Sequence, residues 1–141
     1  HADIENNQAH SGLGHTRTLS SVIAHEIVHV LIEKKFGYFA SRFGPFFRQD
    51  DFSPMKYLWK EEGYAEYIAG DIKPSFEEGL DFLRGKTTVQ HNAHIVEYFK
   101  SYLAVKYLLE VKNYKAGEIF AQKILFDEVV SKAIEFYQQE S

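Results

Sequence analysis

The segment "LSSVIAHEIVHVLIEKKFG", residues 19–37, constrains the fold of this chain more than any other stretch. Its apolar residues recur at the spacing of one helical stripe: Ile23, Ile27, Val30 and Leu31. This spacing predicts a helix whose apolar stripe faces the core. Ionisable residues nevertheless occupy the middle of the segment, at His25, Glu26 and His29. Their presence in so apolar a helix calls for a chemical reason, because burying them unpaired would cost several kcal/mol, on the order of 2–7 for each polar group.

Most of the remaining chain also predicts helices. Thr16 or Thr18 is expected to cap the first helix, and Gly37 is expected to end it. Further helices are predicted where proline fits a first turn and where apolar residues recur with a helical period, over residues 54–70, 74–85 and 93–113. A polar turn is predicted over 86–92, and the tail from 116 to 141 predicts one or two closing helices.

The predicted fold class is therefore mostly α, as an α or α+β protein. No clean run of alternating apolar and polar residues is present, so at most a small strand or hairpin is expected, in residues 1–18 or 38–53. The length of 141 residues and the hydrophobic content of 45% predict one domain with its own core, spanning 1–141. Residues 1–15 are polar and contain glycine, and they are expected to form a flexible arm.

Composition excludes several classes of function. A net charge of −4 gives no basic surface for nucleic acid, and no apolar run reaches the roughly 18 residues of a membrane span. With no cysteine, neither a disulfide framework nor a thiolate metal site can form. The chain begins at His1 rather than Met, so a processed or truncated protein, or an extracytoplasmic one, is expected. The compartment and the oligomeric state remain unassigned.

The pattern "HEIVH", residues 25–29, supplies the chemical reason for the ionisable residues. On a helix, positions i and i+4 lie on one face, so His25 and His29 can direct their imidazoles at one point. Two such ligands suit a tetrahedral zinc ion. Glu26, displaced around the helix, is then placed to act as general base on an activated water. One zinc ion per chain is therefore expected.

A third protein ligand is predicted in the second helix, within "WKEEGYAEY", residues 59–67. Glu62 is the preferred ligand, and Glu61 is the neighbouring alternative. Glu66 lies one turn after Glu62 and is expected to hydrogen-bond the second ring nitrogen of a ligand histidine. Small residues are expected to let the two helices approach closely: Gly63, Ala65 and Ala69.

These two motifs together resemble the gluzincin metallopeptidases, the peptidase-MA-like group with aminopeptidase-N-like and thermolysin-like enzymes. In that group the second motif reads Trp-x-x-Glu-Gly-x-Ala, and this chain matches it at Trp59, Glu62, Gly63 and Ala65. The resemblance implies a zincin-like domain in which Glu62 is the third zinc ligand. Only 24 residues precede His25, which leaves room for a small β element before the active-site helix.

The resemblance also implies an oxyanion-stabilising tyrosine. Aminopeptidase-N-like enzymes carry a Tyr-x-x-Gly element early in a later helix, and "YFKS" is similar, with Ser101 in place of glycine. Tyr98 is the candidate and Tyr102 its neighbour. A phenol is a suitable donor toward developing negative charge. His91 and His94 precede this element and are expected to be surface or capping residues.

The function predicted from these features is zinc-dependent hydrolysis of a peptide bond in a peptide or protein substrate. The ligands would be His25, His29 and Glu62, with Glu26 as general base and Tyr98 as oxyanion donor. The alternative of a different class is a zinc-containing binding or scaffold domain with little or no peptidase activity. A metallohydrolase acting on a non-peptide amide is a further alternative.

Overall fold

The computed structural model describes residues 2–3, 8–10, 16–36 and 59–140. Helices dominate this part of the chain, which confirms the predicted mostly α class. A small antiparallel sheet precedes them. The elements in chain order are β1 (Ala2–Asp3), β2 (Gln8–His10), β3 (Thr16–Thr18), α1 (Leu19–Phe36), α4 (Trp59–Ala69), α5 (Phe76–Leu83), α6 (Ala93–Glu110), α7 (Ala116–Ala121) and α8 (Phe126–Glu140).

The sheet has the order β1-β2-β3, and both of its pairings are antiparallel. In β2, Ala9 pairs with Ala2 on one side and with Arg17 on the other. The small β element expected within residues 1–18 is therefore present. Part of the segment expected to be an arm, residues 2–3 and 8–10, is paired as strands. The alternative position for a hairpin, 38–53, lies outside the described residues.

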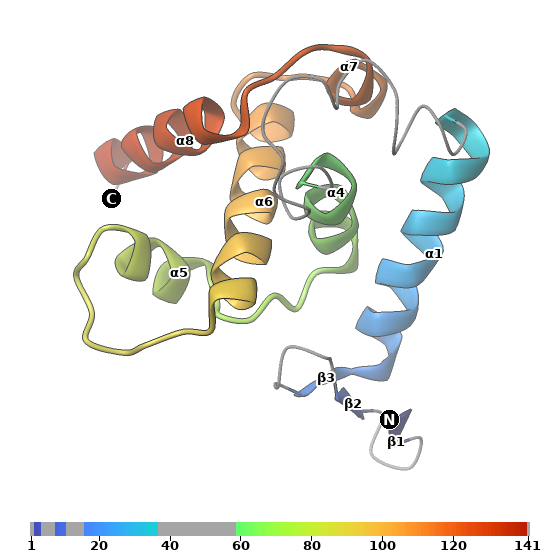
Figure 1. The fold of residues 1–141 in the computed structure, drawn as a ribbon, viewed down its shortest axis with the longest axis horizontal. Helices are drawn as coiled ribbons and strands as arrows, with labels where there is room; N and C mark the ends of the chain where they lie inside the picture. The colour runs from blue at the N-terminus through green and yellow to red at the C-terminus, as the bar shows by residue number, and fades with distance from the viewer. Residues whose placement is uncertain (1, 4–7, 11–15, 37–58, 141) are drawn as a thin grey trace.

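Helix α6 is central, and the other helices pack around it (Figure 1). Helix α4 lies between α6 and α1, whereas α5 and α8 lie on the other side of α6. The main core gathers around the middle of α6, where Leu103, Ala104 and Val105 are completely buried. A smaller core joins α1 to α4 and α7, and it consists of Val28, Ile32, Ala65 and Phe120.

The helix ends follow ordinary capping chemistry. Thr18 caps α1, because its Oγ1 accepts a hydrogen bond of 3.2 Å from the backbone N–H of Ser21. Pro74 was predicted in the first turn of the next helix but lies just before it. Ser75 caps α5, and its hydroxyl accepts from the N–H of Glu78. Gly70 follows α4 with a φ of +69°, a conformation that glycine adopts without a steric penalty. The predicted helix boundaries at Pro54 and Gly37 lie outside the described residues.

The predicted core-facing stripe of α1 is wrong. All four of its residues are largely exposed to solvent. Their exposed fractions are 49% for Ile23, 51% for Ile27, 57% for Leu31 and 65% for Val30. The side of α1 that packs against α4 instead carries Val28 and Ile32, which are 5% and 3% exposed. Apolar residues occur on both sides of α1, so periodicity predicted the helix correctly but chose the wrong side. Within the described ranges, no helix is both long and apolar enough to cross a membrane.

Candidate metal centre

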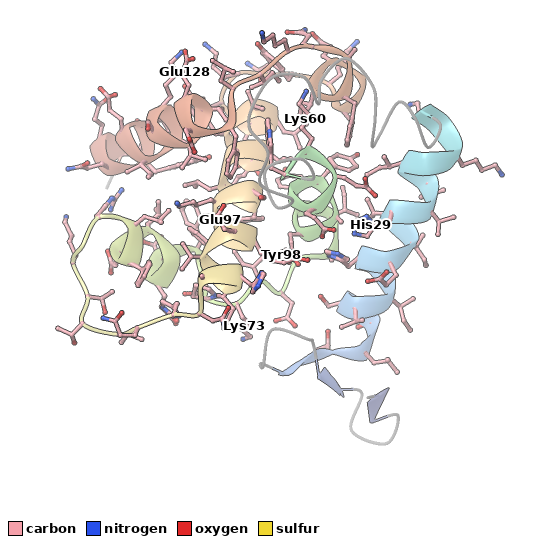
Figure 2. The ribbon with its side chains drawn as sticks, viewed as in Figure 1. His29, Lys60, Lys73, Glu97, Tyr98 and Glu128 are labelled. Carbon is pink, nitrogen blue, oxygen red and sulfur yellow. The ribbon has the colours of Figure 1, made fainter. Side chains whose placement is uncertain are left out.

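The two histidines of the HEIVH motif lie on the side of α1 that faces α4. The start of α1 is held against the end of α4 by hydrogen bonds, from the Thr18 N–H to Asp71 at 3.3 Å and from the Ser21 hydroxyl to the Gly70 carbonyl at 3.3 Å. One and two turns further along α1, His25 and His29 face α4, and Figure 2 shows His29 between the two helices. His25 is 8% exposed. The helical spacing thus places both imidazoles in one interface.

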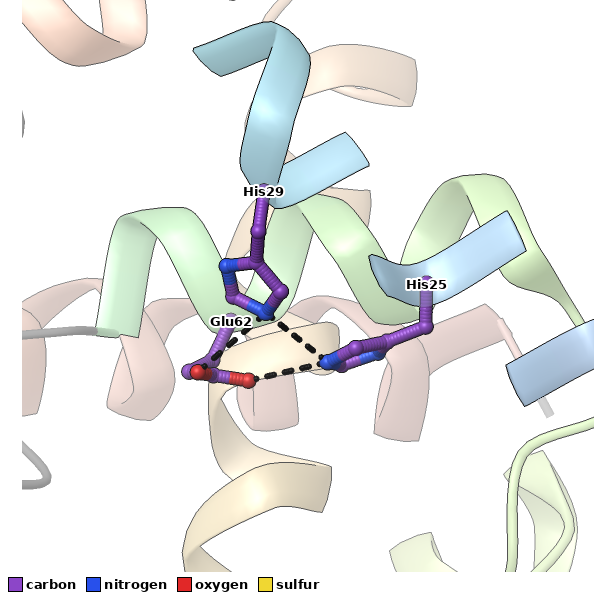
Figure 3. A group of neighbouring side chains, drawn as sticks. All are labelled: His25, His29 and Glu62. Atoms are coloured by element: carbon purple, nitrogen blue, oxygen red, sulfur yellow. Dashed lines mark hydrogen bonds and ion pairs between the residues drawn. The ribbon is translucent and has the colours of Figure 1, made fainter. Parts of the chain in front are cut away.

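Three ligand atoms come together there (Figure 3). The Nε2 atoms of His25 and His29 are 2.9 Å apart. The Glu62 carboxylate lies 3.2 Å from His25 Nε2 through Oε2 and 3.3 Å from His29 Nε2 through Oε1. A tetrahedral zinc ion, with bonds of about 2.0–2.2 Å, sets its ligand atoms about 3.3–3.5 Å apart. The two separations between Glu62 and the histidines are therefore close to those of a zinc site. The two Nε2 atoms are about half an ångström too close, so the rings would have to move apart by that amount.

The buried carboxylate of Glu62 also fits a cation. Its Oε2 is inaccessible to solvent, and its contact with His25 Nε2 is an ion pair without well-aligned hydrogen-bond geometry among the described residues. A buried acceptor without a well-aligned donor is unfavourable, and a metal ion would satisfy it. Among the described residues, His25, His29 and Glu62 are the group of at least three side chains that could hold a metal, with ligand atoms all within 4.8 Å of one another.

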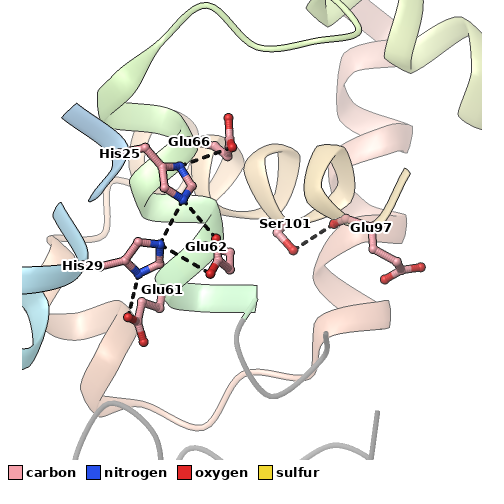
Figure 4. Close-up of polar contacts among 7 residues, drawn as sticks. All are labelled: His25, His29, Glu61, Glu62, Glu66, Glu97 and Ser101. Carbon is pink, nitrogen blue, oxygen red and sulfur yellow. Dashed lines mark hydrogen bonds and ion pairs between the residues drawn. The ribbon is translucent and has the colours of Figure 1, made fainter. Parts of the chain in front are cut away.

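Two further carboxylates lie behind the histidines (Figure 4). His29 Nδ1 is 2.7 Å from Glu61 Oε1, and His25 Nδ1 is 3.3 Å from Glu66 Oε1. The first contact is a short hydrogen bond, and the second is an ion pair without well-aligned hydrogen-bond geometry. A carboxylate at Nδ1 favours the tautomer with its proton there, which leaves the Nε2 lone pair directed at the shared point.

Glu66 therefore lies where the sequence predicted, beside the ring of His25, while Glu61 makes a contact that the sequence analysis missed. Glu61 was considered as an alternative ligand, but its side chain, which is 2% exposed, contacts the outer nitrogen of His29. Because α1 and α4 run antiparallel, the later histidine meets the earlier glutamate. The two adjacent glutamates before Gly63 could have indicated that one of them contacts a histidine. Choosing the right one required knowing that α1 and α4 are antiparallel.

The charges of the site are strongly coupled. Burial opposes protonation of His25, but the carboxylates of Glu62 and Glu66 outweigh it and raise the pKa of His25 to about 9. Burial likewise opposes protonation of His29, and Glu61 and Glu62 raise its pKa to about 10. Burial alone would raise the pKa of Glu62, but the two imidazoles lower it to about 2. Two imidazoles with Nε2 atoms 2.9 Å apart cannot both direct a proton at each other, whereas one shared cation satisfies both lone pairs.

Glu26 and Tyr98, the predicted base and oxyanion donor, lie on α1 and α6. Glu26 is exposed on α1 and follows His25 in the sequence. Tyr98 lies on α6, between α6 and α1 in the view of Figure 2. Burial raises the pKa of Tyr98 to about 12, with further contributions from the charges of Glu62, Glu66 and Glu26. The phenol is therefore close enough to the site to sense its carboxylates, and it keeps its proton at neutral pH.

The small residues of α4 serve two different interfaces. Ala65 is fully buried in the small core shared with α1, as expected for a helix that approaches the histidines closely. Gly63 faces α6 instead, because a Cβ at this position would lie 2.2 Å from the Ser101 carbonyl oxygen. Ser101 is itself 1% exposed, and its hydroxyl donates to the Glu97 carbonyl at 2.9 Å (Figure 4). Gly63 thus brings α4 against α6, which carries Tyr98, and the expectation that it thins the side facing α1 was wrong.

The other histidines considered in the sequence lie elsewhere. His91 packs edge-on against Phe82, with ring centroids 5.0 Å apart, and His94 is exposed at the start of α6. Comparison of the chain with protein-family models, curated proteins and solved structures finds no match. The functional assignment therefore depends on the two motifs and on the geometry of the site.

Proposed function

We propose that this protein is a zinc-dependent hydrolase that cleaves peptide bonds, with one zinc ion held by His25, His29 and Glu62. The observation that supports this most directly is the convergence of two Nε2 atoms and one buried carboxylate, with a second carboxylate at the Nδ1 of each histidine. Imidazole nitrogens and a carboxylate oxygen are a typical donor set for catalytic zinc, which uses three protein ligands and keeps one position open.

The proposed mechanism assigns one task to each side chain. When bound, zinc supplies a Lewis acid that polarises a carbonyl and lowers the pKa of water. Glu26 accepts the proton of the attacking water and later delivers it to the leaving amine. Tyr98, whose pKa is raised to about 12 and which therefore stays protonated well above neutral pH, donates a hydrogen bond to the oxyanion of the tetrahedral intermediate. Glu61 and Glu66 hold the ligand imidazoles in orientation.

The zinc site is tested by elemental analysis of the purified protein. The expected result is about one zinc per chain, which is lost in His25→Ala and in His29→Ala. His94→Ala is a matched control, because this histidine is exposed and lies outside the group. Full retention of zinc in both ligand variants would refute the site.

The hydrolytic role is tested with Glu26→Gln and a peptide library. This variant should retain zinc and the circular dichroism spectrum of the wild type but lose cleavage by about two to four orders of magnitude, because the base is removed while the ligands remain. Glu78→Gln, on the exposed side of α5, is the control. If wild type binds zinc but cleaves no peptide, the scaffold alternative replaces the hydrolase. Equal cleavage by the Glu26 variant would exclude Glu26 as the base.

A further inference from the structure

A cavity of about 360 Å³ lies between the C-terminal end of α6 and the N-terminal end of α8. Helix α8 and helix α1 lie on opposite sides of α6, so this cavity is separate from the proposed zinc site (Figure 1). Its volume falls in the range of small-molecule sites, which is roughly 300–1,000 Å³. The cavity therefore has the size of a second binding site, on a part of the molecule that the proposed hydrolysis does not use.

The polar lining of this cavity is mostly cationic. Lys112, Lys123 and Lys132 line it, and Glu128 is its one acidic side chain. Glu128 is already paired with Lys132, at 3.0 Å. In the described part of the chain, no carboxylate lies within ion-pair distance of Lys112 or Lys123. Three lysines and one glutamate give this lining a charge of +2 in a chain whose net charge is −4, so the site favours an anion.

The rest of the lining is apolar and aromatic. Leu108 and Val129 form a buried floor, at 4% and 5% exposed, and Leu125 is 44% exposed at the same cavity. Tyr107 and Tyr114 add ring surface and a hydroxyl each. An exposed leucine beside a buried apolar floor favours a ligand with an apolar body, because contact with such a ligand removes that surface from water.

The two adjoining helix ends have opposite effects on an anion, because a helix is partly negative at its C-terminal end and partly positive at its N-terminal end. At the end of α6, two carbonyls already have partners, since Tyr107 O accepts from the N–H groups of Val111 and Lys112, and Leu108 O accepts from Tyr114. On the other side, Glu128 and Val129 lie in the first turns of α8. The positive end of the α8 dipole therefore adds to the field of the lysines.

We propose that this cavity binds a small organic anion, an acid group carried on an apolar or aromatic body. The acid group would lie between Lys112 and Lys123, and the body would cover Leu125 and the floor beneath it. Phosphate esters and carboxylates share this chemistry. This proposal is independent of zinc binding and of hydrolysis.

The test is a titration followed by amide NMR spectra, with phenyl phosphate as the probe. Benzyl alcohol supplies the ring without the charge, and inorganic phosphate supplies the charge without the ring. Saturable shifts are expected for residues 112–114 and 123–129 with phenyl phosphate, with at least about tenfold weaker binding of either control. Benzoate in place of phenyl phosphate distinguishes a carboxylate from a phosphate ligand.

Matched variants decide whether Lys112 and Lys123 are responsible for binding. The double variant Lys112→Gln/Lys123→Gln should weaken phenyl phosphate binding about tenfold, while Lys34→Gln/Lys86→Gln, which removes the same charge from exposed sites elsewhere, should leave it within about twofold. Absence of saturable shifts in the wild type, or an equal loss in both double variants, would overturn the proposal. Equal binding of inorganic phosphate and phenyl phosphate would overturn the apolar part of the site.

Discussion

Glu61 offers the sharpest test of the proposed zinc site, because its predicted role depends on the structure rather than on the motif. Its carboxylate is 2% exposed and lies 2.7 Å from the Nδ1 of His29. Glu66 has the corresponding position at His25, at a longer distance of 3.3 Å and with 7% exposure. Glu61→Gln retains an acceptor for the His29 N–H but removes the negative charge.

The expected magnitude follows from these contacts. Loss of a carboxylate that orients a ligand histidine typically lowers metal affinity by about 10- to 100-fold. Glu61 makes the shorter and more buried contact, so Glu61→Gln is expected to cost at least as much as Glu66→Gln, about tenfold or 1.4 kcal/mol. Glu62→Ala, which removes a ligand, should cost more than either variant.

The assay is competition for zinc against a chelating dye, at fixed pH and ionic strength. Glu77→Gln, an exposed change of the same chemistry in the first turn of α5, serves as the control for charge alone. Urea denaturation of each apoprotein separates a loss of zinc affinity from a loss of fold.

Two outcomes would refute the reasoning. If Glu61→Gln binds zinc as tightly as Glu77→Gln does, the contact with His29 does not orient the ligand. If Glu61→Ala loses zinc more completely than Glu62→Ala, Glu61 is itself the ligand and α4 is rotated by about one residue, or 100°, relative to the structure described above.

Three more predictions concern pH and packing. The carboxylates of Glu61, Glu62 and Glu66 outweigh burial and raise the pKa values of His25 and His29, so protons compete with zinc near neutral pH. Apparent zinc affinity should therefore rise at least about tenfold per pH unit between about pH 6 and 8, and a flat profile in the same titration would contradict this. Gly63→Ala should destabilise the protein by about 1–3 kcal/mol in urea denaturation, because its Cβ would meet the Ser101 backbone, whereas Gly117→Ala, with nothing within 4 Å, should be neutral or stabilising. Val30→Ser should change stability by no more than about 0.5 kcal/mol while Ile32→Ala costs about 2–5, and a large cost of the Val30 change would show that its side of α1 is covered in solution.

The sequence predicted which side chains of α1 and α4 lie together better than it predicted the packing of α1. The convergence of His25 and His29 is a property of any regular helix, so it could be inferred without knowledge of the neighbours. Glu62 required a second helix of suitable composition, which "WKEEGYAEY" supplied. Glu61 could not be placed, because its contact with His29 depends on the antiparallel crossing of α1 and α4.

Helix α1 shows why the packing was harder to predict. Both Ile27 and Val28 are apolar residues in a helical pattern, but they are 51% and 5% exposed. Periodicity identifies a helix and its apolar sides, whereas the neighbouring helix decides which side is buried. For Gly63 the sequence predicted a close approach correctly, but only the structure shows that α6 is the helix that approaches.

The division of the core into two clusters would give the proposed metal a mechanical role. Helix α1 contributes no residue to the larger cluster around α6. It joins the described body through the smaller cluster, the two histidines and the hydrogen bonds from Thr18 and Ser21 to the end of α4. A zinc ion held by His25 and His29 of α1 and by Glu62 of α4, as proposed, would therefore cross-link that smaller interface. Its removal should favour local unfolding of α1, together with the sheet that leads into it, while α4 to α8 remain folded. Amide exchange along α1 would then report directly on how much of the protein carries its metal.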